Sequence, residues 1–234
     1  MTTHPIVIVV DGVIASGKST YIGMLLKTLT QRGWRVTVVK EPVDKWQESG
    51  ALKRFYSDPK RWGYTFQTTA FHDRVMENVE AFEKYGARSD VFILERSPFT
   101  DTLFVEMLHE SGTIDDYEFA EYKKWWKMWY RLMPYEPDMF IYLRPDLPEA
   151  MQRLKERARD GEQTVSMEYQ MALSAKHDLF FASNAVAIGD SHFIPCFRLA
   201  TNENFRDDET VQHKLTLHFE DLVNSIRTAK NREK

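Results

Sequence analysis

A phosphate-binding loop near the N-terminus is the clearest chemical feature of this 234-residue sequence. It has the pattern G-x-x-x-x-G-K-[ST], and its residues are Gly12, Val13, Ile14, Ala15, Ser16, Gly17, Lys18, Ser19 and Thr20. The glycines let backbone N–H groups turn inward around phosphate oxygens, while Lys18 can reach the β- and γ-phosphates and Ser19 can ligate magnesium. An apolar run precedes the loop and an amphipathic segment follows it. The pattern predicts binding of a nucleoside triphosphate, and it leaves hydrolysis, transfer and binding alone all open.

Charged residues also follow two other apolar runs. Glu41 precedes Pro42, which favours an extended or turn conformation for Glu41. Its carboxylate could accept the proton of an alcohol during phosphoryl transfer, or it could be an ordinary solvated side chain. Glu95 could hold magnesium, and the adjacent Arg96 could neutralise charge on transferring phosphoryl oxygens. A structural ion pair is the alternative for these two residues.

A long helix is predicted over residues 62–85, because apolar residues recur there at spacings of three and four. Gln67 and Arg74 are two turns apart, so both project from nearly the same face of this helix. The Gln67 amide has donors and an acceptor in one plane, which suits the edge of a nucleobase, and Arg74 has a rigid fork of donors. A solvated polar face is the alternative interpretation.

Short apolar segments alternate with helical patterns along the chain. The predicted strands are residues 6–10, 35–40, 91–95, 139–143 and 193–199. This alternation predicts an α/β fold of the P-loop NTPase type, with a five-stranded parallel sheet flanked by helices. Ligands bind at the carboxyl ends of the strands in such sheets, which is where the phosphate loop, Glu41 and Glu95 lie. We expect a single domain over residues 1–234.

Composition limits the partners. The chain is 43% hydrophobic and 28% charged with a net charge of −4, which disfavours a polynucleotide partner. We expect no membrane span and no secretion signal, because apolar stretches are too short, although a removed organelle-targeting peptide would leave no trace. The single cysteine, Cys196, cannot form an intramolecular disulfide. It fits the cytoplasm or another reducing compartment.

Taken together, the motifs resemble those of the deoxyribonucleoside kinases, typified by deoxycytidine and deoxyguanosine kinases. The resemblance covers almost the whole chain and includes the phosphate loop, the Glu41-Pro42-Val43 turn with Trp46, the block of residues 58–68, and Glu95-Arg96-Ser97. It implies that Glu41 is the base for the sugar 5′-hydroxyl, that Arg96 binds the 5′-oxygen and phosphate, and that Glu95 is a magnesium-associated carboxylate. It also implies that Trp46 belongs to the substrate site.

The resemblance implies further substrate contacts from the same family. Gln67 would bind the edge of the base, Phe66 would stack on it, and Tyr56 would contact the 3′-hydroxyl. A helical lid is expected at about residues 153–163, where Arg153, Arg157 and Arg159 would close over the ATP phosphates and Glu162 would reach the 3′-hydroxyl. The family usually has two consecutive acids here, and Gly161 replaces the first. The adenine-binding loop would contain Glu203, Asn204 and Phe205.

Base preference is expected to depend on Arg74 and Asp101, which the family places together beside Gln67. Relatives that take deoxycytidine, deoxyadenosine or deoxyguanosine have Arg and Asp at these positions, whereas relatives that prefer thymidine usually have small or apolar residues. A carboxylate oriented by an arginine can accept from an exocyclic amine, but thymine presents a carbonyl and a methyl group there. We therefore expect thymidine to be the poorest substrate. Either Phe104 or Val105 could line the base pocket.

The expected function is transfer of the γ-phosphoryl group of ATP, or of another nucleoside triphosphate, with Mg²⁺ to a deoxynucleoside. A nucleoside monophosphate kinase and a catalytically silent scaffold subunit of the same fold are the alternatives. The aromatic-rich segment of residues 117–133 is too apolar around its circumference to be freely exposed. Core packing and a helix-to-helix subunit contact both remain open, and the resemblance implies a homodimer.

Overall fold

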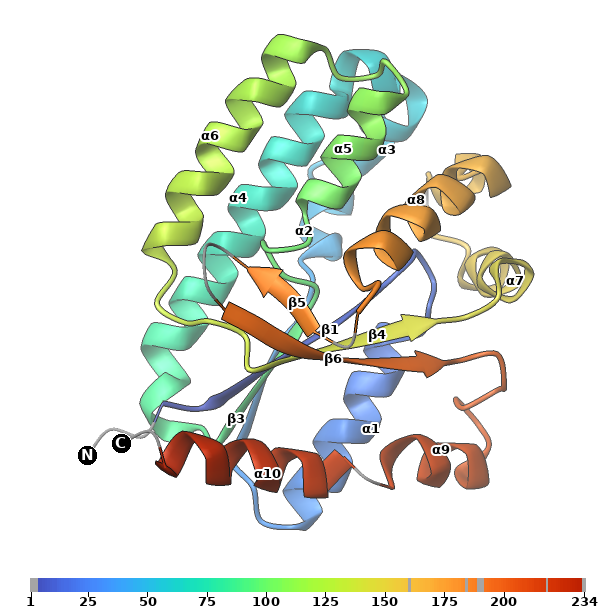
Figure 1. Ribbon diagram of the computed structural model, residues 1–234. Helices are drawn as coiled ribbons and strands as arrows, with labels where there is room; N and C mark the ends of the chain where they lie inside the picture. Colours follow the sequence, from blue (N-terminus) through green and yellow to red (C-terminus); the bar gives the residue numbers. More distant parts are fainter. Residues whose placement is uncertain (1–3, 160, 184, 189–191, 218, 233–234) are drawn as a thin grey trace.

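Alternating apolar side chains in β1 (Ile6–Gly12) explain why the central sheet is covered on both faces. Ile8 packs with apolar residues of α1 (Lys18–Gln31) and of the C-terminal helices. Its neighbour Val9 points to the opposite face and packs in a second apolar cluster. Both side chains are completely buried. The result is a three-layer arrangement, with α1, α9 and α10 on one side of the sheet and the larger group of helices on the other (Figure 1).

The structure is a computed structural model that describes residues 4–159, 161–183, 185–188, 192–217 and 219–232. The further strands are β2 (Val36–Val39), β3 (Val91–Glu95), β4 (Met139–Arg144), β5 (Ala185–Ile188) and β6 (His192–Ala200). The further α-helices are α2 (Val43–Glu48), α3 (Ala51–Ser57), α4 (Pro59–Tyr85), α5 (Thr102–Glu110), α6 (Asp116–Leu132), α7 (Leu147–Arg157), α8 (Met167–Phe180), α9 (Glu209–Thr216) and α10 (Phe219–Arg232). Two short 3₁₀ helices are η1 (Gly86–Arg88) and η2 (Glu162–Thr164).

The sheet has six strands in the order β2-β3-β1-β4-β6-β5, so the expectation of five strands was wrong by one. The five expected strands are all present and run parallel to one another. The additional strand, β5, pairs antiparallel with β6 at the edge of the sheet. Its apolar segment is only four residues long, which is too short to show a period.

Helix α4 begins three residues earlier than expected because Asp58 caps it. The Asp58 carboxylate accepts a hydrogen bond of 3.1 Å from the backbone N–H of Arg61, and Pro59 occupies the first turn, where its missing N–H costs nothing. The helix then continues for 27 residues to Tyr85. This length carries Phe66, Gln67 and Arg74 on one continuous support.

Helix α6 has one packed face and one exposed face. Tyr122 is buried in the core beneath α4, and the Trp126 indole donates a hydrogen bond of 2.8 Å to the carbonyl of Pro98. The exposed face has Tyr117 at 74%, Trp125 at 42% and Leu132 at 61% exposure. The homodimer stays a prediction, and this apolar face is the part of α6 available for a subunit contact.

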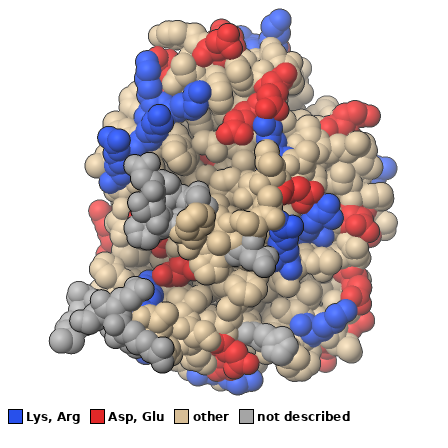
Figure 2. Space-filling view, in the orientation of Figure 1, with Lys and Arg blue, Asp and Glu red and all other residues tan. Residues whose placement is uncertain are grey.

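Charges of both signs are interspersed on the face shown in Figure 2. Along the described stretches of the chain, no helix is both long enough and apolar enough to cross a bilayer.

The phosphate loop depends on a glycine at the end of β1. Gly12 has a φ of 149°, and a Cβ added there would lie 2.4 Å from the carbonyl oxygen of Leu143 in β4. We expect Gly12→Ala to lower the free energy of unfolding by at least about 1–3 kcal/mol, because the strained backbone and the clash act together. Urea denaturation measures this change.

Gly23→Ala is the matched control, since Gly23 lies inside α1 and a Cβ there meets nothing within 4 Å. It should raise the free energy of unfolding by about 0.5–1 kcal/mol, as alanine restricts the unfolded chain more than glycine does. Equal effects of the two substitutions would contradict the strained geometry at Gly12.

Candidate active site

One cavity of about 940 Å³ opens at the carboxyl ends of the central strands. It brings together most residues expected at the site, which come from segments far apart in the sequence. The expected residues that line it are Ile14, Ala15, Ser16, Gly17, Lys18, Ser19, Thr20, Glu41, Trp46, Tyr56, Phe66, Gln67, Arg74, Glu95, Arg96, Asp101, Arg153, Arg157, Arg159, Glu162, Asn204 and Phe205. Gly12, Val13 and Glu203 do not line it.

The phosphate loop curls around the amine of Lys18. Its Nζ donates hydrogen bonds to the carbonyls of Gly12 at 3.3 Å and Val13 at 3.0 Å. Ala15 adopts a positive φ of 61°, which helps to turn successive N–H groups to the same side. Burial lowers the pKa of Lys18 to about 7, and the charge of Arg96 adds to the lowering. Phosphate oxygens beside Lys18 would restore its charged form.

The hydroxyl of Ser19, at the start of α1, contacts the carboxylate of Glu95, at the end of β3. Ser19 Oγ donates a hydrogen bond of 2.6 Å to Glu95 Oε1. Both groups are oxygen ligands of the kind that Mg²⁺ accepts. No cluster of three or more His, Cys, Asp or Glu side chains able to hold a metal occurs among the described residues. A magnesium ion beside Ser19 and Glu95 would therefore take its other ligands from triphosphate oxygens and water.

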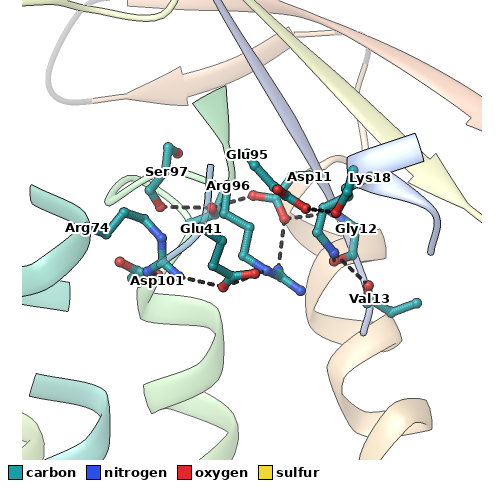
Figure 3. A network of polar contacts seen from close by, with 12 residues as sticks. Asp11, Gly12, Val13, Lys18, Glu41, Arg74, Glu95, Arg96, Ser97 and Asp101 are labelled. Atoms are coloured by element: carbon teal, nitrogen blue, oxygen red, sulfur yellow. Dashed lines mark hydrogen bonds and ion pairs between the residues drawn. The ribbon is translucent and has the colours of Figure 1, made fainter. Parts of the chain in front are cut away.

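The carboxylate of Glu41 lies between two guanidinium groups (Figure 3). Glu41 Oε1 is 2.7 Å from Arg74 Nη2 and 3.3 Å from Arg96 Nε. Burial alone would raise the pKa of Glu41, but the charges of Arg96, Arg74 and Lys18 lower it overall. Glu41 is therefore ionised at neutral pH and can accept a proton.

Arg74 also contacts Asp101, and both side chains are buried. The two carboxylates raise the pKa of Arg74 although burial opposes this, so the guanidinium stays charged. Burial raises the pKa of Asp101 to about 6 despite the attraction of Arg74. Within the described part of the chain, Asp101 Oδ2 is buried without a hydrogen-bond partner. This oxygen can accept a hydrogen bond from a ligand in the cavity.

Aromatic rings form an apolar recess next to these charges. Phe66 stacks on Phe55 with ring centroids 4.9 Å apart, and it meets Trp46 edge-on at 5.6 Å. The Trp46 indole is fixed by a hydrogen bond of 2.9 Å to Asp73. Gln67 is only 7% exposed, and its amide forms no hydrogen bond with the described residues. The recess can hold a flat ring and bond its edge.

The open choice between Phe104 and Val105 is resolved by the geometry. Phe104 lines the cavity, with the Arg96 guanidinium 4.8 Å from its ring centroid. Val105 is completely buried in the core beneath α4. Phe104 is therefore the aromatic side chain of α5 that lines the cavity.

Arg157 and Glu162 both line the cavity, and they pair with each other there. Arg157 Nη2 donates to Glu162 Oε1 at 2.6 Å, and its Nε donates to Oε2 at 3.1 Å. Gly161 has a φ of 87°, and an added Cβ would lie 3.1 Å from the Tyr56 ring. Tyr56 therefore packs closely against this segment, and burial together with Tyr169 and Glu162 raises the pKa of its hydroxyl. Asp160, within the expected lid, lies outside the described residues.

On the other side of the phosphate loop, Arg153 packs over the ring of Phe205 at 5.3 Å and donates to the carbonyl of Glu203 at 3.1 Å. Phe205 also approaches Gly17 so closely that an added Cβ would lie 2.4 Å from the ring. The Glu203 side chain points away and pairs with Lys214 at 3.0 Å. Asn204 and Phe205 line the cavity, whereas Glu203 contributes a backbone carbonyl to hold Arg153.

Sequence analysis missed Asp11, which anchors Arg96 from outside the cavity. Asp11 Oδ1 accepts hydrogen bonds from Arg96 Nη1 at 3.0 Å and from the N–H of Gly12 at 2.7 Å. The Thr100 hydroxyl donates to Oδ2. The available signal was a carboxylate at the end of an otherwise apolar strand, which must be paired when buried. Tyr169 and Phe55 line the cavity and gave no signal, because aromatic residues on helices are usually core.

Comparison with known proteins agrees with this geometry. The family described as "Deoxynucleoside kinase" matches residues 8–224. A probable deoxycytidine kinase of Fowlpox virus is 32% identical over 219 residues, which cover 93% of this chain and 88% of the relative. Deoxycytidine kinase 2 of Gallus gallus is 31% identical over 92% of this chain and 89% of its own length. A mitochondrial deoxyguanosine kinase of Xenopus laevis is 27% identical over 88% of this chain and 85% of its own length. The chain therefore belongs to the deoxynucleoside kinase family.

Proposed function

We propose that this kinase transfers the γ-phosphoryl group of ATP, or of another nucleoside triphosphate, to the 5′-hydroxyl of a deoxyribonucleoside. One observation carries the proposal. The Glu41 carboxylate and the Arg96 guanidinium lie in the same cavity as the phosphate-loop amine of Lys18 and the recess of Phe66 and Gln67. A nucleoside in the recess and a triphosphate in the loop would meet at Glu41 and Arg96.

Each charged group has a definite task in this proposal. Glu41 accepts the proton of the 5′-hydroxyl as the phosphoryl group is attacked. Arg96 and Lys18 neutralise charge on the transferring oxygens. Mg²⁺, held beside Ser19 and Glu95, would supply further charge neutralisation on the triphosphate. Arg153, Arg157 and Arg159 are the lid residues that close over the phosphates of the donor. Asn204 and Phe205 contact the base of the donor.

Deoxycytidine, deoxyadenosine and deoxyguanosine are the proposed acceptors, in preference to thymidine. The buried Oδ2 of Asp101 supports this choice, because an ionised carboxylate accepts from an exocyclic amine and repels a carbonyl oxygen. Arg74 keeps that carboxylate oriented. The relatives from Fowlpox virus and Gallus gallus are named as deoxycytidine kinases, which also favours deoxycytidine as an acceptor.

An assay with labelled ATP, Mg²⁺ and two panels of acceptors tests the function. Transfer to deoxynucleosides supports the proposal, transfer only to their monophosphates supports a nucleoside monophosphate kinase, and transfer to neither supports a silent scaffold subunit. The arrangement of Lys18, Glu41 and Arg96 favours the first outcome. A scaffold subunit needs neither a proton acceptor such as Glu41 nor phosphate ligands such as Lys18 and Arg96.

Glu41→Gln should lower the single-turnover rate by roughly 10²–10⁴ while the Kd of the deoxynucleoside changes by less than a few-fold, because the amide keeps the shape but cannot accept the proton. Rapid-quench kinetics with radiolabelled ATP measures the rate. Glu48→Gln, at an exposed position of the neighbouring helix α2, serves as the control and should leave the rate unchanged. An undiminished rate in Glu41→Gln would contradict the assignment of Glu41 as the proton acceptor.

Lys18→Ala should abolish measurable binding of the triphosphate and lower phosphoryl transfer by at least about 10²-fold, because it removes the positive charge that the loop encloses. Calorimetric titration with ATP and a thermal unfolding curve separate lost binding from lost folding. Lys27→Ala, on the exposed face of the same helix, should match the wild type in both measurements. Wild-type kinetics in Lys18→Ala would contradict the role of the loop.

Arg74→Met combined with Asp101→Ala should raise the kcat/KM for thymidine relative to that for deoxycytidine by at least about tenfold, because both charges leave the recess together. Steady-state assays with the four deoxynucleosides measure the ratio. Asp101→Ala alone is the comparison, since it removes one of the two carboxylates that pair with the buried Arg74 and leaves only Glu41. It should lower the free energy of unfolding. A wild type that already prefers thymidine would refute the specificity argument.

A further inference from the structure

A histidine outside the cavity contacts the carboxylate that anchors Arg96. His177, on α8, and Asp11, on β1, are both completely buried, and neither lines the cavity. His177 Nε2 is 3.3 Å from Asp11 Oδ1. Its Nδ1 is 2.8 Å from the carbonyl of Leu173, one turn earlier in the same helix. The imidazole therefore links α8 to the strand that leads into the phosphate loop.

The direction of the hydrogen bond to Asp11 follows from donor and acceptor chemistry. Hydrogen bonds from His177 and the charge of Arg96 hold the pKa of Asp11 well below its usual range, although burial alone would raise it. An ionised carboxylate only accepts hydrogen bonds, so His177 Nε2 must carry a proton and donate it.

Neighbouring rings fix the orientation of this imidazole. Tyr142 stacks on it with centroids 5.9 Å apart, and Phe104 meets it edge-on at 6.2 Å. Phe104 also lies beneath the Arg96 guanidinium. Phe104 thus packs against both His177 and Arg96.

Arg96 itself needs an anchor of this kind. It has a positive φ of 61°, which is uncommon for a residue with a Cβ, and its side chain is divided among several partners. Nη1 bonds Asp11 and Nε lies next to Glu41. Nη2 makes no hydrogen bond to the described residues, and the side chain lines the cavity. With Nη1 and Nε held, Nη2 is the atom left for a phosphoryl oxygen.

We propose that His177 is a positioning residue, which orients the Asp11 carboxylate so that Asp11 holds the Arg96 guanidinium in the geometry for phosphoryl transfer. The inference rests on the proposed function, since Arg96 acts on the transferring group there. A second contact ties the same helix to the loop: Gln170 Nε2 donates a hydrogen bond of 2.8 Å to the carbonyl of Ile14. Helix α8 thereby supports the loop at two points, and only the His177 contact reaches the catalytic arginine.

Two isosteric substitutions separate positioning from packing. Glutamine places its amide nitrogen near Nε2, and asparagine places its nitrogen near Nδ1. His177→Gln therefore keeps the donor to Asp11, whereas His177→Asn keeps only the bond to Leu173. We expect kcat within about threefold of the wild type for His177→Gln. For His177→Asn we expect a 10- to 100-fold lower kcat, the scale of loss for a misplaced catalytic group, with KM for the deoxynucleoside within about threefold.

A double-mutant cycle with Arg96→Ala shows whether His177 acts through the arginine. In that background, His177→Asn should change the single-turnover rate by less than about twofold, because the group it positions is absent. Thermal unfolding of every variant sets the assay temperature well below its midpoint. If His177→Asn does not fold, His177→Met takes its place, since it fills the space without a donor.

Equal kcat values for His177→Gln and His177→Asn, or the same loss with and without Arg96, would overturn the inference and leave a packing role. A wild type that phosphorylates no deoxynucleoside would instead contradict the proposed function, and the positioning role would fall with it. An active wild type with equal variants contradicts the inference alone.

Discussion

A buried charge is costly unless an opposite charge or hydrogen bonds compensate it, and the candidate site is built on that constraint. Acidic and basic side chains alternate through the interior, each contacting the next, in the order Asp101, Arg74, Glu41, Arg96, Asp11 and His177. Removing one member of such a buried pair typically costs about 3–5 kcal/mol, because the partner is left uncompensated. The apolar recess around Phe66 and Gln67 and the support of the phosphate loop are therefore connected through one electrostatic chain.

Much of this site could be predicted because its parts have local sequence signals. The phosphate loop is a continuous motif between a strand and a helix, so its position follows from short-range pattern alone. Glu41 and Arg96 follow strands directly, and the carboxyl ends of parallel strands meet at one edge. The Arg74 and Asp101 pair came from the family resemblance, since a separation of 27 residues between a helix and a loop has no local signature.

The remaining features depend on distances that sequence patterns do not encode. Asp11 and His177 are 166 positions apart, and nothing in either segment indicates that they meet. Glu162 lines the cavity, and its contact with the 3′-hydroxyl stays a prediction. The structure adds that Arg157, at the end of α7, donates hydrogen bonds to both of its carboxylate oxygens, a pairing between two helices that has no sequence signature. Strand β5 was missed because four apolar residues can equally be a loop, and its pairing with β6 decides the matter.

The central place of β1 has a consequence for the chain as it leaves the ribosome. β1 is complete at Gly12, but its neighbours begin only at Val91 and Met139, because the chain order and the sheet order differ. At about 5–20 residues per second, synthesis needs on the order of ten seconds to reach the second of them. During that interval β1 cannot pair on both sides, so its apolar side chains are exposed to aggregation unless nascent local structure or chaperones cover them.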